Sequence, residues 1–327
     1  MIVTRTPLRV SLFGGGTDLG AYYEEHEGAV LSLTIERSVS VIVRSRYDGD
    51  LVVNHERQER ARDAAGIEHC IVREALRVAG VTSGADVTCL TDVPPGGTGL
   101  GSSSALTVGL LNALFAYRGE PRNARELAEL ACRIEIEVLG EPIGKQDQYA
   151  AAFGGCREYR FHRDGAVSVD RVALSSEVEL ALSHHVALYD TGRTRLAASV
   201  LADQRANVPR TTHHLHALKE AVGPGRRALM EGDMEALGRL LHRCWAHKKR
   251  LSAKIHDDEL DRIYERALGA GAYGGKLLGA GGGGFFLFVC PPGRRDELRT
   301  ALGEMRELPF QLEPRGSRVV LGLPDRT

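Results

Sequence analysis

Residues 94–105 read PPGGTGLGSSSA and stand between a strand-like run and a helix-like run. The preceding residues 85–91 alternate apolar and polar side chains, as a half-buried strand does. In the following residues 106–115, leucines and a phenylalanine recur at helical spacing, and Gly119 is typical of the end of such a helix. Glycines let backbone N–H groups converge on one point, which the positive end of the helix dipole also faces. The stretch therefore predicts a phosphate-binding turn.

Three hydroxyl side chains, Ser102, Ser103 and Ser104, fall in the first turn of this predicted helix. They can cap the helix, contact a phosphate or reach a phosphate-bound Mg²⁺. For an isolated glycine run, a turn whose serines only cap a helix is the simpler explanation. The string is not a P-loop, because no lysine follows its second glycine, and it lacks the G-x-G-x-x-G spacing of a dinucleotide-binding turn.

Length and charge limit the classes of function. The chain has 327 residues, which is enough for two domains with separate cores. Its net charge of −1 and its dispersed basic residues argue against a nucleic-acid partner, and its apolar runs are too short to span a bilayer. The N-terminal residues lack the pattern of a secretory signal, so we expect a cytoplasmic protein.

Cysteine and histidine give no metal pattern. The six cysteines include no C-x-x-C pair, and we interpret them as reduced thiols of the core or surface. His213, His214 and His216 are close in sequence but lack the acidic and cysteine neighbours of a metal site. We interpret them as a solvated helix face and assign them no role.

Strand and helix patterns are mixed along the chain and predict the α+β class. In the first half, residues 38–44 and 157–172 alternate, whereas Asn123 and Glu126 make a capping-box start to a helix that ends at Gly140. In the second half we predict a strand over 178–188, helices over 194–205, 225–250 and 258–268, and strands over 285–289 and 318–323. A boundary near residue 172 then gives two domains, 1–172 and 173–327.

A second glycine string, Gly279-Ala280-Gly281-Gly282-Gly283-Gly284, precedes the apolar run 285–289. It can be read as a mobile loop, because ordering such permissive residues costs roughly 1–2 kcal/mol each. That cost favours a purpose for the ordered string. We expect two backbones to approach closely there.

Three stretches resemble the motifs of the GHMP small-molecule kinases. Residues 94–105 are similar to the family signature P-x-x-x-G-L-[GS]-S-S-[AS], and KLLGAGGGGF at 276–285 is similar to the third family motif. PLRVSLFGGGTD at 7–18 resembles the first. The three motifs occur in family order and span nearly the whole chain. The resemblance implies a two-domain α+β fold, with a ribosomal-protein-S5-like N-terminal domain and a ferredoxin-like C-terminal domain, and a kinase that uses ATP with Mg²⁺.

The resemblance also assigns roles to single residues. The stretch 134–148 is similar to the galactokinase-type segment that ends in G-x-x-D-Q, which makes Asp147 the base that takes the acceptor proton. Arg9 matches the basic residue near the reacting oxygen, where a surface salt bridge is the alternative reading. Glu135, three turns upstream of Asp147 on the same helix, matches the Mg²⁺ carboxylate together with the hydroxyl of Ser103. Glu137 and Glu141 are alternatives to Glu135, since a slip in alignment exchanges them.

The remaining expected contacts come from the same three motifs. The expected ATP-binding residues are Pro95, Gly97, Gly99, Leu100, Gly101, Ser102, Ser103 and Ser104. The expected substrate-binding residues are Gly15, Gly16, Thr17, Asp18, Thr191, Gly192, Arg193, Gly281 and Gly282.

The acceptor is constrained by one departure from galactokinases, which carry Glu and His where this chain has Gly15 and Gly16. FGGGTD at 13–18 and GKQDQYAAAFGG at 144–155 instead resemble the D-glycero-D-manno-heptose 7-phosphate kinases. That resemblance implies phosphorylation of the anomeric hydroxyl, giving a 1,7-bisphosphate. A phosphorylated acceptor needs a cationic anchor, and the candidates are Arg193, Arg195 and Lys145.

Two alternatives remain open. The first is a 1-kinase of an unphosphorylated sugar such as fucose or a mannose-like hexose; Asp190 before Thr191, where heptose kinases more often carry an aromatic residue, leaves room for it. The second is a non-catalytic GHMP-fold regulator that binds nucleotide or sugar, which the presence of Asp147, Glu135 and Ser103 disfavours. The expected partners are ATP and a sugar or sugar phosphate, and a homodimer is left open.

Overall fold

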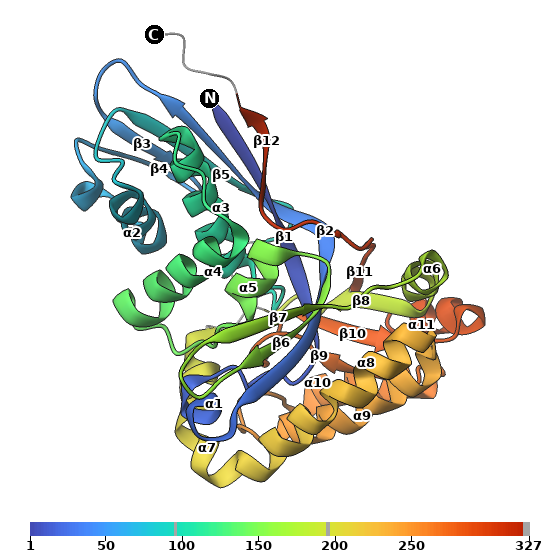
Figure 1. Ribbon diagram of the computed structural model, residues 1–327. Coiled ribbons are helices and arrows are strands. Elements are labelled where there is room, and N and C mark those ends of the chain that lie inside the picture. The colour runs from blue at the N-terminus through green and yellow to red at the C-terminus, as the bar shows by residue number, and fades with distance from the viewer. Residues whose placement is uncertain (95–96, 194–196, 323–327) are drawn as a thin grey trace.

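Two sheets organise the chain in a computed structural model that describes residues 1–94, 97–193 and 197–322 (Figure 1). The first sheet has eight strands in the order β12-β1-β2-β5-β3-β4, and β6 and β7 extend it from β2. Its strands are β1 (Ile2–Phe13), β2 (Gly28–Ser45), β3 (Leu51–Asn54), β4 (Gln58–Ala61), β5 (Ala85–Thr91), β6 (Cys156–Phe161), β7 (Val167–Arg171) and β12 (Arg318–Gly322). The predicted strand over 85–91 and the hairpin of 157–172 are confirmed.

Helices of the N-terminal half pack on this sheet. They are α1 (Gly20–His26), α2 (Cys70–Ala79), α3 (Ser102–Tyr117), α4 (Ala124–Cys132) and α5 (Gln146–Phe153), with a short 3₁₀ turn over Ala64–Gly66 and a π-helical turn over Arg133–Val138. The capping box of Asn123 and Glu126 is present at the start of α4, as predicted. Helix α3 packs against β1 and β2, and most of its side chains are buried because it is apolar nearly all round.

The second sheet has the order β11-β8-β10-β9, with every neighbouring pair antiparallel. Its strands are β8 (Val186–Asp190), β9 (Gly274–Leu277), β10 (Phe285–Val289) and β11 (Arg306–Leu308). The helices of this half are α6 (Ser176–His185), α7 (Ala197–Glu220), α8 (Val222–Glu231), α9 (Met234–Lys249), α10 (Asp258–Gly269) and α11 (Arg295–Ala301), with a 3₁₀ turn over Pro292–Arg294. From β8 to β11 the order is strand, helices, strand, strand, helix, strand, which is the ferredoxin-like arrangement.

The C-terminal strand returns to the first sheet. β12 pairs antiparallel with β1, and the backbone N–H of Glu313 donates to the carbonyl of Thr34 at 3.0 Å. Figure 1 accordingly shows the last described strand beside the first. The division into 1–172 and 173–327 stays a prediction. Strand β12 belongs to the second range by its residue numbers but to the first sheet by its pairing.

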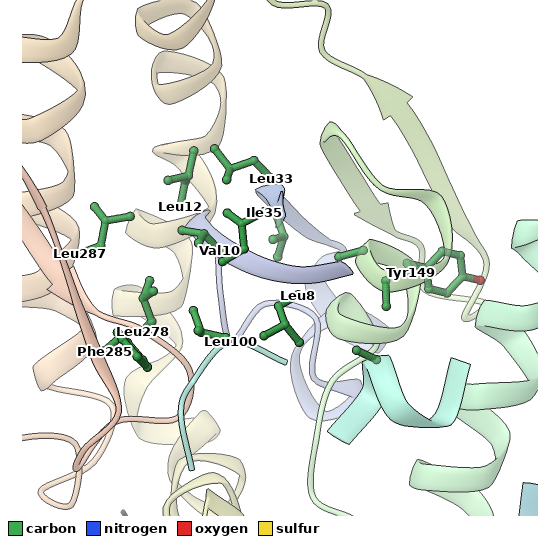
Figure 2. Packing of buried hydrophobic residues seen from close by; sticks show 14 of the residues in the cluster. Leu8, Val10, Leu12, Leu33, Ile35, Leu100, Tyr149, Leu278, Phe285 and Leu287 are labelled. Atoms are coloured by element: carbon green, nitrogen blue, oxygen red, sulfur yellow. The ribbon is translucent and has the colours of Figure 1, made fainter. Parts of the chain in front are cut away.

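Strand β1 has two different faces. Leu8, Val10 and Leu12 are buried in the hydrophobic core, which Figure 2 shows continuing to Leu33, Ile35, Leu100, Leu278, Phe285 and Leu287. Because side chains alternate along a strand, Arg9 and Ser11 lie on the opposite face, where both line a cavity. The core thus fixes the strand, and the strand positions the polar residues.

Three sequence expectations of the second half are corrected. Residues 176–185 form a helix rather than a strand: Ser175 caps it, and Val178 and Leu182 are buried while Leu180 is 58% exposed, which is helical spacing. The predicted helix over 225–250 is two helices, because Gly232 ends α8 with φ +71°. The helix expected to end at 205 continues to Glu220.

The histidine cluster lies on α7 and is not simply a solvated face. His213 is exposed, but Nδ1 of His216 lies 2.7 Å from the Tyr22 hydroxyl, and Nδ1 of His214 lies 3.0 Å from that of His247. These contacts join α7 to α1 and α9. Over the ranges described here, no three histidine, cysteine or acidic side chains gather as a metal site, and no helix has the length and hydropathy of a membrane span.

Candidate active site

One cavity of about 280 Å³ collects residues from segments that are far apart in the sequence. Its wall is formed by the end of β1, the glycine turns after β1 and before α3, the first turn of α5, and parts of α7, α9 and β9. Many residues singled out from the sequence line it: Arg9, Gly15, Gly16, Asp18, Gly97, Gly99, Gly101, Ser102, Ser103, Ser104, Glu135, Glu141, Asp147, Gly279 and Ala280.

The glycine turn before α3 has the backbone that a phosphate cradle needs. Gly97, Gly99 and Gly101 have φ of +66°, +76° and +75°, which favours glycine at each position. The first intrahelical bond runs from the N–H of Ala105 to the carbonyl of Gly101, so the N–H groups of residues 102–104 have no helical acceptor. A Cβ on Gly101 would lie 3.1 Å from Cγ of Arg9, so a side chain there would crowd the arginine.

The two glycine strings meet, as expected from the sequence. A Cβ on Gly279 would lie 2.3 Å from Cα of Gly99, and the N–H of Phe285 donates to the carbonyl of Thr98 at 3.2 Å. The ammonium of Lys248 holds the second string from beneath, because Nζ donates to the carbonyls of Leu277 and Gly279 at 2.7 and 2.6 Å. The contacts between the two glycine strings join the two halves of the chain at the cavity.

Arg9 and Asp147 form a bidentate ion pair. Nε and Nη2 of Arg9 donate to Oδ1 and Oδ2 of Asp147, each at 2.7 Å, and Nη1 donates to the carbonyl of Gly99. The side chain of Arg9 is 5% exposed and that of Asp147 is 25% exposed. The fork therefore fixes the plane of a carboxylate that still reaches the cavity.

Asp147 and Glu135 are not on one helix, which corrects the sequence expectation. The helix that carries Glu135 ends near Leu139, and Asp147 lies in the first turn of the separate helix α5. Glu135 itself lies in the π-helical turn, where the N–H of Leu139 donates to the carbonyl of Ile134 at 2.9 Å. Such turns interrupt α-helices and are frequent at functional sites.

Glu135 is a buried carboxylate with polar but uncharged partners. It is 1% exposed; Oε1 accepts a hydrogen bond from the hydroxyl of Ser103 at 2.9 Å, and Oε2 accepts one from Nε2 of Gln148 at 2.7 Å. Burial raises the pKa of Glu135 to about 7. Within the described chain no cationic side chain pairs with it, whereas Glu137 is exposed to solvent. Of the three carboxylates considered, Glu135 and Glu141 line the cavity and Glu137 does not.

Asp18 is held by backbone N–H groups. Oδ1 accepts from Gly16 at 3.0 Å and Oδ2 accepts from Gln146 at 3.2 Å. Burial, and then the negative charge of Asp147, raises the pKa of Asp18. A Cβ on Gly144 would lie 2.0 Å from Oδ2 of Asp18. The G-x-x-D motif therefore has two roles: its glycine leaves room for the carboxylate of Asp18, and its last residue is Asp147.

Several predicted residues lie apart from the cavity lining. The hydroxyl of Thr17 is buried 2.8 Å from the carbonyl of Gly14, and Oγ1 of Thr191 donates to the carbonyl of Gly284 at 2.8 Å. Neither these two nor Leu100, Gly192, Arg193, Gly281 and Gly282 line it. Pro95 and Arg195 lie outside the described residues. Their assignments to ATP or substrate stay predictions.

Two of the three proposed phosphate anchors, Arg193 and Lys145, are engaged elsewhere. Nη2 of Arg193 lies 2.6 Å from Oδ2 of Asp257, and Nζ of Lys145 donates to the carbonyl of Gly165 at 2.7 Å. Instead, sequence reasoning missed other polar residues of the cavity wall, among them Ser11, Gln146, Gln204, Lys248 and Lys276. Ser11 and Lys276 lie inside two of the family-like motifs, and Gln146 directly precedes Asp147, so their closeness to a motif could have indicated them. Nothing in the sequence around Lys248 indicates a place in the cavity.

Comparison with known proteins gives the family. The model of the GHMP kinase N-terminal domain matches residues 65–155, and that of the C-terminal domain matches residues 226–307. A D-glycero-alpha-D-manno-heptose 7-phosphate kinase of Campylobacter jejuni is 33% identical over 318 residues, which cover 92% of this chain and 93% of the relative. The chain belongs to the GHMP kinases.

Two further relatives also carry the names of kinases that act on sugars or sugar phosphates. A solved D-glycero-D-manno-heptose 1-phosphate kinase of Bacteroides thetaiotaomicron superposes with a TM-score of 0.83 at 26% identity, covering 99% of this chain and 100% of that one. A bifunctional fucokinase/GDP-fucose pyrophosphorylase of Arabidopsis thaliana is 26% identical over 92% of this chain and 31% of its own length. This GHMP kinase has the two-domain α+β fold of the family and is an ATP-dependent kinase that phosphorylates a sugar hydroxyl.

Proposed function

We propose that this GHMP kinase transfers the γ-phosphoryl group of ATP to the anomeric hydroxyl of D-glycero-D-manno-heptose 7-phosphate, giving ADP and the 1,7-bisphosphate. The observation that carries the proposal is the Arg9–Asp147 pair, which lies in one cavity directly beside the glycine turn that precedes α3. An acceptor hydroxyl beside Asp147 then faces a phosphate held at that turn. The Campylobacter relative supports the choice of sugar.

Asp147 is the base in this mechanism. As the acceptor oxygen bonds to the γ-phosphorus and the bond to the ADP oxygen breaks, the carboxylate takes the hydroxyl proton. Arg9 orients that carboxylate through two hydrogen bonds, and its positive charge stabilises the negative charge on the transferring group. The low exposure of Arg9 strengthens this interaction, since little water screens it.

The residues of the cavity fit a Mg²⁺ ion. The carboxylate of Glu135 and the hydroxyl of Ser103 are hard oxygen donors 2.9 Å apart at the start of α3. Glu135 is buried, and no cationic side chain of the described chain pairs with it, which is costly unless a cation comes with the ligand. When bound with ATP, the ion neutralises the β- and γ-phosphate charge. Glu135 and Ser103 are the residues that would hold it.

Small residues form the acceptor end of the cavity. Gly15 and Gly16 line it, and Gly16 has φ +97°, so a side chain is disfavoured there and room is left for a sugar with an extended carbon chain. Asp18 offers free lone pairs to sugar hydroxyls, and the buried Oε1 of Gln146 has no partner in the described structure. Both are hydrogen-bond acceptors for a polyol.

A substrate panel tests the proposal. ADP release is measured with heptose 7-phosphate, fucose, mannose, galactose and mannose 6-phosphate under the same conditions. We expect the highest kcat/KM for heptose 7-phosphate. A higher value for a free hexose would contradict the proposed acceptor while leaving the sugar kinase assignment in place.

A second candidate is a 1-kinase of an unphosphorylated sugar. It is favoured by the engagement of Arg193 and Lys145 in other contacts, which removes two anchors expected for a far phosphate. The resemblance to a fucokinase of Arabidopsis agrees with it. In the panel above it predicts comparable or higher activity on fucose or mannose.

A further inference from the structure

Two lysines of the C-terminal half line the cavity with buried ammonium groups. Lys248 lies on α9 and is 8% exposed, and Lys276 lies on β9 and is 6% exposed. Their hydrogen-bond partners are backbone carbonyls: Leu277 and Gly279 for Lys248, and Leu12 at 3.1 Å for Lys276. Across residues 1–94, 97–193 and 197–322, neither forms an ion pair with a carboxylate.

Burying two ammonium groups without a carboxylate is unfavourable. The desolvation cost of a buried ion amounts to several kcal/mol unless an opposite charge compensates it. Burial lowers the pKa of both lysines, that of Lys276 to about 8. The charge of Lys276 and then that of Arg9 lower the pKa of Lys248 further, and the charge of Arg9 also lowers that of Lys276. The fold therefore places two amino groups in the wall of this cavity at a cost to its own stability.

The carboxylates of the cavity do not pair with these amino groups. Asp147 is bound by Arg9, Glu135 by Ser103 and Gln148, and Asp18 by backbone N–H groups. The fourth carboxylate that lines the cavity, Glu141, forms no ion pair with either lysine in the described structure. An ammonium has three N–H donors, and Lys276 uses one of them in the hydrogen bonds of the described structure. Two N–H donors of Lys276 therefore have no hydrogen-bond partner in the described structure.

The two lysines hold segments next to both glycine turns of the cavity. Lys248 bonds to Gly279, which is packed against Gly99 of the phosphate-binding turn. Lys276 bonds to Leu12, at the end of β1 just before the acceptor turn of Gly15 and Gly16. A phosphate group at this place is within the region that both donor and acceptor reach.

We propose that Lys248 and Lys276 form an anion subsite that binds a phosphate group in the cavity. That phosphate is either the γ-phosphate of ATP or the phosphate ester of the acceptor; the second identity rests on the proposed function, whereas the subsite itself does not. A lysine pair suits this role because each ammonium is a compact point charge whose pKa rises when an anion arrives.

The test compares charge with hydrogen bonding. Lys276→Gln and Lys248→Gln remove one charge each but retain a donor for the carbonyls, and Lys276→Arg retains the charge. Lys249→Gln is the matched control, because Lys249 neighbours Lys248 on α9 but pairs with Asp261 at 3.1 Å and does not line the cavity. Thermal unfolding selects the variants that fold.

Calorimetric titration of the full-length protein with inorganic phosphate is the first measurement. We expect the two glutamine variants to bind phosphate at least tenfold more weakly than the wild type, and the arginine variant and the Lys249 control to stay within threefold. Equal phosphate affinity in the wild type and both folded glutamine variants would overturn the subsite.

Two affinity ratios then identify the phosphate. If it comes from ATP, the ratio of affinities for the β,γ-imido analogue of ATP and for ADP falls at least tenfold in the glutamine variants. If it comes from the acceptor, the ratio for heptose 7-phosphate and heptose falls instead. If the protein bound neither heptose nor heptose 7-phosphate, the proposed acceptor would be wrong. The titrations with phosphate and with nucleotides would still test the subsite. No change in either ratio would overturn it.

Discussion

Glu135 and Lys276 face the same cavity from opposite halves of the chain, and they contrast with the pair between them. Each is a buried charge with no oppositely charged side chain in the described structure, whereas Arg9 and Asp147 satisfy each other. The paired charges are oriented before any ligand arrives. The unpaired carboxylate and ammonium suit a ligand that brings its own cation and anion, as a magnesium–phosphate complex does.

The paired charges give the largest expected effect. We predict that Asp147→Asn lowers kcat by roughly 10²–10⁴ while ATP binding is nearly unchanged, because the amide cannot take the acceptor proton. Steady-state kinetics and nucleotide titration on the folded variant check this. Wild-type turnover in that variant would show that Asp147 is not the base.

The unpaired carboxylate comes next. Glu135→Ala should raise the Mg²⁺ concentration for half-maximal activity by roughly ten- to a hundredfold, the scale of a charge-assisted contact of about 1.5–3 kcal/mol. Glu137→Ala is the matched control, since Glu137 is exposed two residues further on. If Glu137→Ala had the larger effect in a Mg²⁺ titration, Glu137 rather than Glu135 would be the metal ligand.

The next effect concerns Lys248 and Lys276 and the phosphate group of the acceptor. Removing it from heptose 7-phosphate should lower kcat/KM by roughly ten- to a hundredfold, and raised salt should narrow that gap only modestly because the lysines are buried. Kinetics with heptose and heptose 7-phosphate at saturating ATP measure both effects. Equal values for the two sugars would favour a plain sugar 1-kinase.

What the sequence predicted depends on how local the signal is. The turn at 97–101 needs residues with positive φ, and its glycines predict it. The strand before the turn and the helix after it are predicted by their local periodicity. The helix at 176–185 was mistaken for a strand because Val178, Leu180 and Leu182 alternate over too short a run to separate the two periods.

Tertiary neighbours were harder to predict than local structure. Lys248 stands on an ordinary amphipathic helix, and only the approach of the glycine string shows that its ammonium is buried at the cavity. Arg193 was expected to anchor a phosphate, but Asp257, 64 residues away, binds its guanidinium. Long-range pairing of this kind has no local pattern in a single sequence.

The smallest expected effect concerns stability, and it has opposite signs on the two sides of the cavity. In the folded protein the pKa of Glu135 is raised from 4.5 to about 7, so folding takes up a proton and its stabilisation is lost as pH rises between those values. The pKa of Lys276 is lowered from 10.5 to about 8, so its stabilisation is present at high pH and is lost as pH falls through that window. Without ligands, these two groups together should make the protein least stable between about pH 7 and pH 8.

Variants separate the two limbs of this minimum. Thermal unfolding of the ligand-free protein from pH 5 to pH 10 should show Glu135→Gln flattening the acid limb and Lys276→Gln flattening the alkaline limb, each by roughly 2 kcal/mol or a few degrees in Tm. Taking differences from the wild type cancels the titrating groups that do not interact with Glu135 or Lys276. Mg²⁺ with the β,γ-imido analogue of ATP should fill in the minimum, because the ligand supplies the missing charges. If both variants gave the wild-type profile, the two buried charges would not be coupled to folding, and the contrast with the Arg9–Asp147 pair would fail.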